Sequence, residues 1–187
     1  MNRMPPFSTV LDLERGTLEP ERKLVARTLG DMQGMYAAPV PEARLEEVVY
    51  RVNEIPAPLA EGNLLSSTTT IEPGAVDGEY HMTKGHFHKQ LDRAEIYVTL
   101  AGEGLLLMAT EQGKHAVEPM RRGTVNYVPG GWAHRSVNVG VGPLVFFAAF
   151  PADAGYDYKT IEKRGFPVLV VERGGVPDVV PNPRFRG

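Results

Sequence analysis

Three histidines and one glutamate have the types and spacing of a site for one divalent metal. His86 and His88 are separated by a single residue. Residues i and i+2 of a β-strand project from the same face, so both imidazoles can reach one ion. With Glu95 and His134 added, the donor set suits Fe(II), Mn(II), Ni(II) or Zn(II) better than Mg(II) or Ca(II). Cysteine is absent from the chain, so thiolate ligands and disulfides are excluded.

Two predicted strand regions must bring the other two ligands to this pair. From Glu95 onward polar and apolar residues alternate, which places Glu95 and Tyr97 on the same face of a strand. A β-rich run over 123–128 then meets a Pro-Gly-Gly turn at 129–131, and the next strand begins close to His134. Two hairpin-like segments can therefore converge on one point.

The composition predicts a single all-β domain around these ligands. The 187 residues include 20 glycines and 16 prolines, which fall between short apolar segments as in a β-sandwich or barrel. Such a number of strands favours two packed sheets or a closed barrel. The predicted strands cover residues 47–53, 64–71, 80–87, 95–100, 104–109, 115–118, 123–128, 133–139, 143–150 and 167–172.

The first 44 residues are predicted to form an N-terminal extension with one helix. Thr17 is placed as its cap, Pro20 lies in the first turn, and Gly34 ends it. Residues 37–42, with two prolines, then form a linker into a β domain over 45–187. The apolar stripe of the predicted helix consists of Leu24, Val25, Thr28, Leu29 and Met32.

Charge and hydropathy narrow the classes of partner. The net charge of −3 and the scattered basic residues argue against nucleic acid. No apolar run approaches the roughly 20 residues that span a bilayer, and no leader is evident, so we expect a cytoplasmic protein without a membrane partner. Ile96, Val98 and Leu100 form an apolar outer stripe, which predicts a homodimer or a covering sheet.

Two segments of the chain resemble the two cupin motifs. The second motif is matched at every position, by Gly123, Pro129, Gly131, His134 and Asn138. The first motif is matched by His86, His88, Glu95 and Gly102. Six residues separate His88 from Glu95, where the usual motif has three or four.

Longer strings make the chain similar to one cupin family, the metal-dependent glucose-6-phosphate isomerases best known from archaea, which share the six-residue gap. The strings lie at residues 83–88, 91–97, 127–129, 132–135 and 151–158, and the similarity extends over about 45–185. The resemblance implies a cupin double-stranded β-helix, which is a jelly-roll barrel. It also implies interconversion of glucose 6-phosphate and fructose 6-phosphate, a step of glycolysis and gluconeogenesis.

The resemblance implies roles for individual residues. One divalent metal per subunit, with Fe(II) expected first and Mn(II), Ni(II) or Zn(II) as alternatives, would be held by His86, His88, Glu95 and His134. The sugar phosphate would be held by Tyr50, Thr69, Thr83, Gly85 and Tyr158. Two positions depart from the family: Phe150 replaces a common Tyr, and Tyr156, expected beside the substrate, replaces a common His.

The segment before the first histidine pair raises a conflict. Lys84 could add charge to the phosphate site, and strict alternation would point it inward with the histidines. Thr83 and Gly85 would then face outward, so their phosphate contacts require a bend or bulge near Gly85. Arg135, next to His134, should point to the opposite face and form a salt bridge.

The chemistry leaves two mechanisms open. Moving a hydrogen between C1 and C2 needs an electrophile for the oxygens, which a metal supplies, and a group that moves protons. Glu95 is the candidate base, through a cis-enediol intermediate, with Tyr97 as proton donor or positioning group. If Glu95 is only a ligand, a metal-assisted hydride shift remains.

Three rival functions use the same residues. One is a metal-dependent cupin dioxygenase, which gives no reason for Thr83, Tyr158 and the string 151–158. Another is a non-catalytic sugar-binding or storage cupin. The third is an isomerase of a different sugar phosphate, such as mannose 6-phosphate.

Overall fold

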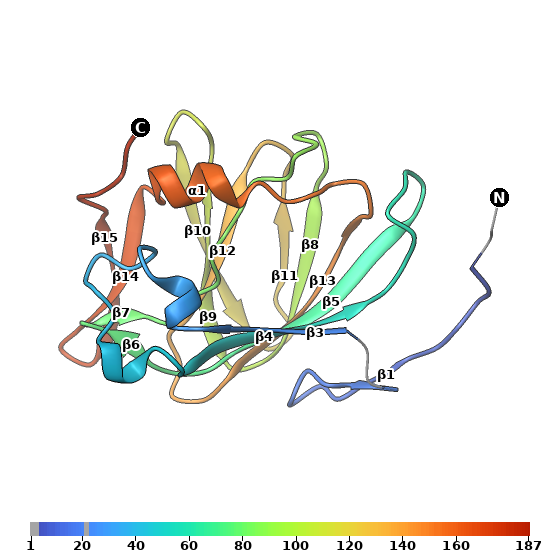
Figure 1. Cartoon of the computed structure of the whole chain (residues 1–187), viewed down its shortest axis with the longest axis horizontal. Helices are drawn as coiled ribbons and strands as arrows, with labels where there is room; N and C mark the ends of the chain where they lie inside the picture. Colours follow the sequence, from blue (N-terminus) through green and yellow to red (C-terminus); the bar gives the residue numbers. More distant parts are fainter. Residues whose placement is uncertain (1–3, 21–22) are drawn as a thin grey trace.

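The chain folds into an all-β barrel, as predicted (Figure 1). The structure is a computed structural model that describes residues 4–20 and 23–187. Its largest sheet has six antiparallel strands in the order β11-β8-β13-β5-β4-β3. These strands are β3 (Lys23–Thr28), β4 (Val48–Ile55), β5 (Leu64–Ile71), β8 (Glu95–Ala101), β11 (Val125–Val128) and β13 (Leu144–Pro151).

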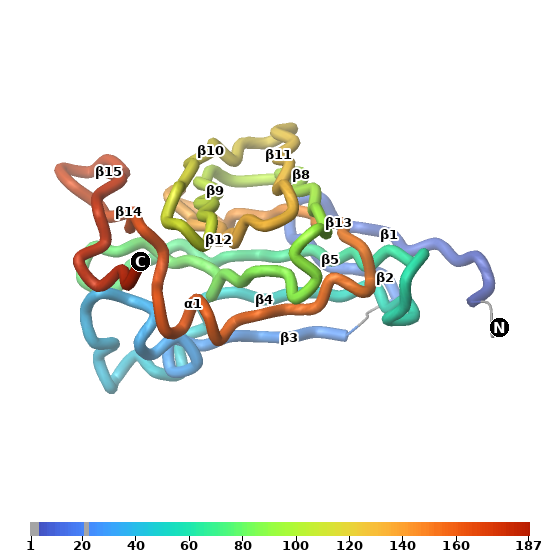
Figure 2. The backbone as a smooth tube through the Cα atoms, turned by 90° about the horizontal axis from the view of Figure 1, so that it is seen from above, coloured from blue at the N-terminus to red at the C-terminus, as the bar shows by residue number. Residues whose placement is uncertain are grey.

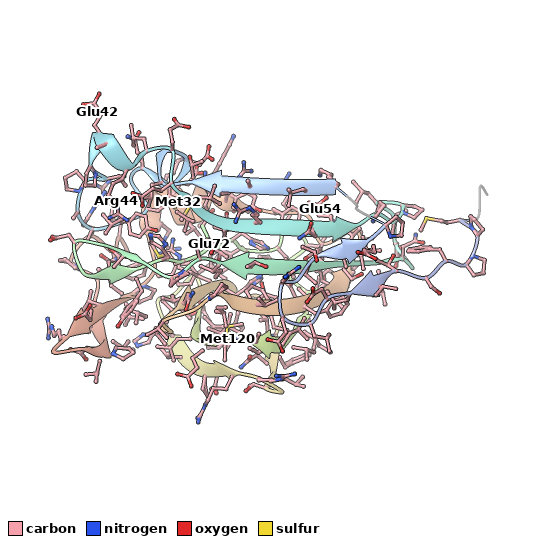
Figure 3. All side chains as sticks on the ribbon, turned by 90° about the horizontal axis from the view of Figure 1, so that it is seen from below. Met32, Glu42, Arg44, Glu54, Glu72 and Met120 are labelled. Atoms are coloured by element: carbon pink, nitrogen blue, oxygen red, sulfur yellow. The ribbon has the colours of Figure 1, made fainter. Side chains whose placement is uncertain are left out.

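A three-stranded antiparallel sheet, in the order β10-β9-β12, faces part of the large sheet. Its strands are β9 (Glu103–Ala109), β10 (His115–Arg121) and β12 (Ala133–Asn138). Seen from above, β8 to β12 surround a common interior (Figure 2). The fully buried Met120 lies between the strands of this barrel (Figure 3). Leu106, Leu107 and Leu144 add to the same apolar core.

A sharp corner carries the chain from the large sheet into the small one. Gly102 lies between β8 and β9 with φ +79°, a backbone conformation that favours glycine. A Cβ atom there would come within 2.2 Å of the carbonyl oxygen of Pro143, so a larger residue would push the two segments apart. The corner lets one hairpin contribute strands to both sheets, which closes the barrel around the predicted metal ligands.

The remaining elements flank the barrel. A four-stranded sheet runs in the order β15-β14-β7-β6, and a small hairpin pairs β1 with β2. These strands are β1 (Val10–Leu11), β2 (Leu18–Glu19), β6 (Ala75–Val76), β7 (Glu79–Tyr80), β14 (Val168–Arg173) and β15 (Val176–Pro181). Two short 3-10 helices are η1 (Gly30–Met32) and η2 (Glu42–Arg44). Neither β1 nor β15 was predicted.

One α-helix, α1 (Tyr158–Arg164), lies on the upper side of the barrel and was not predicted (Figure 1). Asp157 caps it by accepting a hydrogen bond from the backbone N–H of Thr160 at 3.2 Å. Gly165, with φ +72°, ends it. The helix is short, so its sequence carries little periodicity.

The predicted N-terminal helix is wrong. Within the described residues of this stretch, β2, β3 and η1 replace it, and residues 21–22 lie outside the described part. Strand β3 pairs with β4 in the large sheet, with Val25 opposite Val52. Leu24, Thr28 and Met32 are even-numbered as well as four apart, so the stripe that suggested a helix also fits a period of two. Pairing with the edge of β4 selects the strand over the helix.

The strand predicted over residues 80–87 is only partly formed. After β7 the chain continues as an irregular segment with isolated β-bridges, at Met82, His86 and Phe87. The predicted irregularity near Gly85 is confirmed, because this glycine has φ +73°. Within the described residues, no helix is long and apolar enough to cross a membrane.

Candidate metal centre and substrate cavity

The four predicted ligands converge in the folded chain. Each of His86, His88, Glu95 and His134 offers one ligand atom, and these atoms all lie within 4.8 Å of one another. The closest approaches involve the carboxylate, whose Oε2 lies 3.0 Å from Nε2 of His134 and 3.2 Å from Nε2 of His88. The group is buried, with Glu95 4 % exposed and His134 1 % exposed.

The backbone fixes where the ligands lie. Strand β8 begins at Glu95, and β12 carries His134. The irregular segment that follows β7 pairs with β12 through two backbone hydrogen bonds. His134 N donates to the carbonyl oxygen of His86 at 3.1 Å, and His86 N donates to that of His134 at 3.3 Å. This bridge holds two of the imidazoles side by side, with ring centroids 4.4 Å apart.

Backbone carbonyls orient two of the rings. Nδ1 of His88 lies 2.8 Å from the carbonyl oxygen of Arg93, and Nδ1 of His134 lies 3.3 Å from that of Trp132. When Nδ1 carries the proton and donates it, Nε2 keeps a free lone pair, the usual arrangement for a histidine that binds metal. Arg93 is itself held by Asp153, which it contacts at 2.7 Å.

The centre has an unsatisfied donor atom of the kind a metal would occupy. Nε2 of His86 is buried and lacks a hydrogen-bond partner among the described residues, and Nε2 of His134 has the Glu95 carboxylate as its near neighbour. A buried polar atom left unpaired costs about 1–3 kcal/mol, so such atoms in a native fold call for an explanation. Three imidazoles and one carboxylate fit a divalent transition metal, and the group could hold such an ion.

Electrostatics keep the carboxylate ionised and the neighbouring phenol protonated. Burial alone would raise the pKa of Glu95, but the charge of His134 and hydrogen bonds from His134 and His88 lower it to about 2. Burial and the Glu95 charge raise the pKa of Tyr97 well above its ordinary value. At neutral pH, Glu95 is therefore an anion and Tyr97 retains its proton.

A cavity of about 280 Å³ opens beside the ligands and gathers the predicted substrate residues. Tyr97, Glu95, His86 and His134 form its metal side. The predicted substrate residues that line it are Tyr50, Thr69, Thr83, Lys84, Gly85, Tyr156 and Tyr158. His88 is the one predicted site residue that does not line the cavity. Its Nε2 lies 3.2 Å from Oε2 of Glu95.

The irregular segment resolves the conflict in its sequence. Thr83, Lys84 and Gly85 all line the same cavity, which strict alternation along a strand would prevent. A Cβ atom on Gly85 would lie 2.7 Å from the ring of Phe166 and 3.0 Å from the carbonyl oxygen of His134. Any larger residue would therefore displace the backbone that carries the first two histidines.

Aromatic rings form part of the wall of the cavity. Tyr156 meets the ring of His86 edge-on at 4.9 Å and stacks on Tyr158 at 5.7 Å. Phe150, one of the two departures from the family, stacks against His88 at 6.1 Å. Burial raises the pKa of Tyr158 to about 12 and also raises that of Tyr156, so both remain neutral hydrogen-bond donors.

Sequence reasoning missed two basic residues of the cavity. Lys23 and Arg27 both line it, from the strand β3 that was predicted as a helix. Burial raises the pKa of Tyr50, while the Lys84 backbone and the nearby Arg27 guanidinium act in the opposite direction. The alternation of Lys23, Val25 and Arg27 was the signal that could have placed them on one face of a strand.

Arg135 does not form the predicted salt bridge. It is buried, 2 % exposed, and forms no salt bridge within the described chain. Its guanidinium instead donates to the carbonyl oxygen of Lys84, at 3.2 Å from Nε and 2.7 Å from Nη2, and lies over the Phe166 ring. The prediction failed because it assumed a regular strand with a solvated outer face, whereas residues 165–166 and 182–186 cover this side.

Comparison with known proteins agrees with the site. A profile of the glucose-6-phosphate isomerase (GPI) family matches residues 26–180. A glucose-6-phosphate isomerase from Thermococcus gammatolerans is 44 % identical over 96 % of each chain, and one from Pyrococcus furiosus is 45 % identical over 97 % of each. A bacterial relative of the same name, from Sinorhizobium medicae, is 37 % identical over 90 % of this chain and 82 % of its own. The chain belongs to the glucose-6-phosphate isomerase family.

Proposed function

We propose that this protein interconverts glucose 6-phosphate and fructose 6-phosphate with the help of one divalent metal. The observation that carries the proposal is the joining of a buried His-His-Glu-His group to a cavity lined by hydroxyl and basic side chains. Relatives that bear the name of this enzyme cover nearly the whole chain. The metal end suits the reacting carbons of the sugar, and the basic end suits its phosphate.

The metal centre would supply the electrophile. A divalent cation held by His86, His88, Glu95 and His134 would polarise O1 and O2 of the sugar during the transfer of hydrogen between C1 and C2. Tyr97, which is protonated and lines the cavity next to Glu95, is placed to donate a hydrogen bond to a sugar oxygen. Tyr156, whose ring lies 4.9 Å from that of His86, has the same capacity.

The role of Glu95 is better explained by ligation than by base catalysis. A carboxylate that binds a metal has a lone pair engaged and its basicity reduced, so it is a poor general base. Oε2 of Glu95 already lies within 3.2 Å of two imidazole nitrogens. We therefore favour a hydride shift from C2 to C1, with a proton moving from O2 to O1, over the enediol route.

The basic end of the cavity would bind the phosphate. Thr83, Gly85 and Tyr158 offer neutral donors there, and Lys84 and Arg27 add charge. A guanidinium binds a phosphate with paired charge-assisted hydrogen bonds, which are about twice as strong as neutral ones. Strand β3 thus supplies part of the substrate site from the N-terminal region of the chain.

Replacing Arg27 by alanine should weaken substrate binding more than turnover. Loss of a charge-assisted contact is expected to raise KM by about 10- to 100-fold while kcat changes little, because the phosphate is remote from the reacting carbons. Steady-state kinetics with glucose 6-phosphate measure both constants.

The matched control is Arg51→Ala on the neighbouring strand β4. Arg51 pairs with Glu72 at the surface and does not line the substrate cavity. Its substitution should leave KM unchanged. Equal KM values for the Arg27 variant and the unmodified protein would remove Arg27 from the substrate site.

Fe(II) is our proposed native metal, with Mn(II), Ni(II) and Zn(II) as alternatives that the same ligands accept. The donor set supports this class of metal. Elemental analysis of protein purified without added metal identifies the ion; a chain that carries none of the four metals would contradict the proposal.

The direct test of the reaction is a coupled assay that follows fructose 6-phosphate formed from glucose 6-phosphate. Mannose 6-phosphate in the same assay measures the epimer preference. Oxygen consumption, followed in parallel, distinguishes a dioxygenase. Absence of isomerisation with every metal added would overturn the proposed function.

A homodimer is the proposed assembly. The outer face of β8 and β11 carries apolar side chains that are exposed in the single chain: Ile96 at 43 %, Val125 at 63 % and Tyr127 at 61 %. Val125 lies opposite Val98 and Tyr127 opposite Ile96, so the side chains form one continuous patch. Light scattering measures the mass in solution, and a monomer at all concentrations would contradict the dimer.

A further inference from the structure

A second cavity, of about 500 Å³, is lined by other residues than the substrate cavity and takes no part in the proposed reaction. Three segments of the chain enclose it: residues 34–37, the last turn of α1 with Gly165, and the C-terminal residues 182–186. Arg135 of β12 also lines it. The volume falls within the range of small-molecule sites, roughly 300–1,000 Å³.

The lining of this second cavity is strongly basic. It contains Arg135, Lys163, Arg164, Arg184 and Arg186, and a single carboxylate, Glu162. The carboxylate of Glu162 lies 3.7 Å from Lys84, which already offsets its charge. Within the described chain, none of the five basic side chains forms a salt bridge.

The guanidinium groups are held in place by neutral partners. Arg164 donates to the carbonyl oxygens of Arg186 and Glu111, at 3.0 and 2.6 Å. Arg184 donates to that of Tyr36 at 2.6 Å. These bonds fix the side chains without neutralising them, and each guanidinium keeps further N–H donors.

Arg135 shows the same pattern at the inner end of the cavity. It is buried and bonds only to the Lys84 carbonyl and, weakly, to the sulfur of Met35; its Nη1 has no acceptor among the described residues. Glu79 interacts electrostatically with Arg135 and Arg184 but forms no direct ion pair with either and does not line the cavity; its carboxylate accepts a hydrogen bond from the backbone of Ala37. A buried cation without a paired anion is costly unless an anion binds beside it.

We propose that this cavity is a binding site for a small polyanion, with at least two phosphate or carboxylate groups. Planar guanidinium groups match both kinds of group with paired hydrogen bonds. The enclosure by three chain segments favours a small molecule over an extended partner. The ligand would bind in addition to the sugar phosphate, at a separate site.

The second cavity is linked to the substrate cavity by one side chain. Arg135 donates two hydrogen bonds to the carbonyl of Lys84, and Lys84 lines the substrate cavity. A polyanion that binds Arg135 competes with these hydrogen bonds for the guanidinium N–H groups. Its negative charge also offsets positive charge near the substrate phosphate. Its binding is therefore expected to raise KM for glucose 6-phosphate by about fivefold or more.

Calorimetric titration of the metal-loaded protein tests the site without relying on activity. The probes are fructose 1,6-bisphosphate for phosphate groups and tricarballylate for carboxylates; the tighter of the two identifies the preferred group. The test variant is Lys163→Ala/Arg186→Ala, since neither side chain makes a hydrogen bond within the described part of the chain. Its affinity for the preferred probe should fall by at least about tenfold, with kcat unchanged.

The matched control is Arg121→Ala/Arg122→Ala, which removes two charges from the end of β10 and the turn after it, outside the second cavity. This control should bind the probe like the unmodified protein and show the same rise in KM, whereas the test variant should lose that rise. Binding of neither probe, or equal weakening in both double variants, would overturn the proposal. Loss of probe binding in Arg27→Ala alone would assign the ligand to the substrate cavity instead.

Discussion

His134→Ala should abolish both metal binding and isomerase activity. The imidazole of His134 is buried, its Nε2 lies 3.0 Å from Glu95, and its backbone is paired with His86. Removing it leaves the site one donor short, so metal content should fall from about one ion per chain towards zero. We expect kcat/KM to fall by about a thousandfold, because losing a group that stabilises charge in the transition state typically lowers the rate by up to this factor.

The control for this prediction is His115→Ala. His115 begins β10, is exposed, and lies outside the ligand group. It should retain metal and activity. Elemental analysis and kinetics on both variants decide the matter, and a fully active, metal-loaded His134 variant would remove this residue from the centre. Circular dichroism on each variant checks that the barrel is still folded.

Glu95→Gln should lose metal affinity and turnover together. The amide has the shape of the carboxylate but no negative charge, and the carboxylate is the only anionic group among the four ligands. Metal affinity is expected to fall by at least about 10- to 100-fold, and activity with it, to be partly recovered when metal is supplied in excess.

Metal content and turnover of the Glu95→Gln variant, measured together, also separate the two mechanisms. A Glu95 variant that keeps a full complement of metal but has no turnover would establish a base role and favour the enediol route. Recovery of turnover with excess metal would establish ligation and favour the hydride shift. We expect the second result because the Glu95 carboxylate lies within 3.2 Å of two of the other ligand nitrogens.

The barrel and the metal group could be predicted from local sequence patterns. Alternation after Glu95 fixes which side chains share a face, and the turn at 129–131 aims the strand that carries His134. Both predictions agree with the structure because β8 and β12 are regular strands with one face towards the interior. The bend at Gly85 was predictable too, because the functional contacts of its neighbours required it.

The N-terminal region could not be predicted in the same way. The stripe from Leu24 to Met32 fits both a helix and a strand, and only pairing with β4 selects the strand. With that error, Arg27 was lost from the substrate cavity. The burial of Arg135 was missed for a related reason: it depends on the C-terminal residues 182–186, which are distant in sequence and carry no pattern that points to β12.

The central claim is that the buried His-His-Glu-His group holds a metal required for isomerisation. The most direct measurement is the rate of fructose 6-phosphate formation by purified protein after exhaustive chelation, followed by titration with Fe(II), Mn(II), Ni(II) and Zn(II). We predict that chelated protein is inactive and that activity returns in proportion to bound metal, up to one ion per chain. Full activity in protein shown to be free of metal would contradict the account.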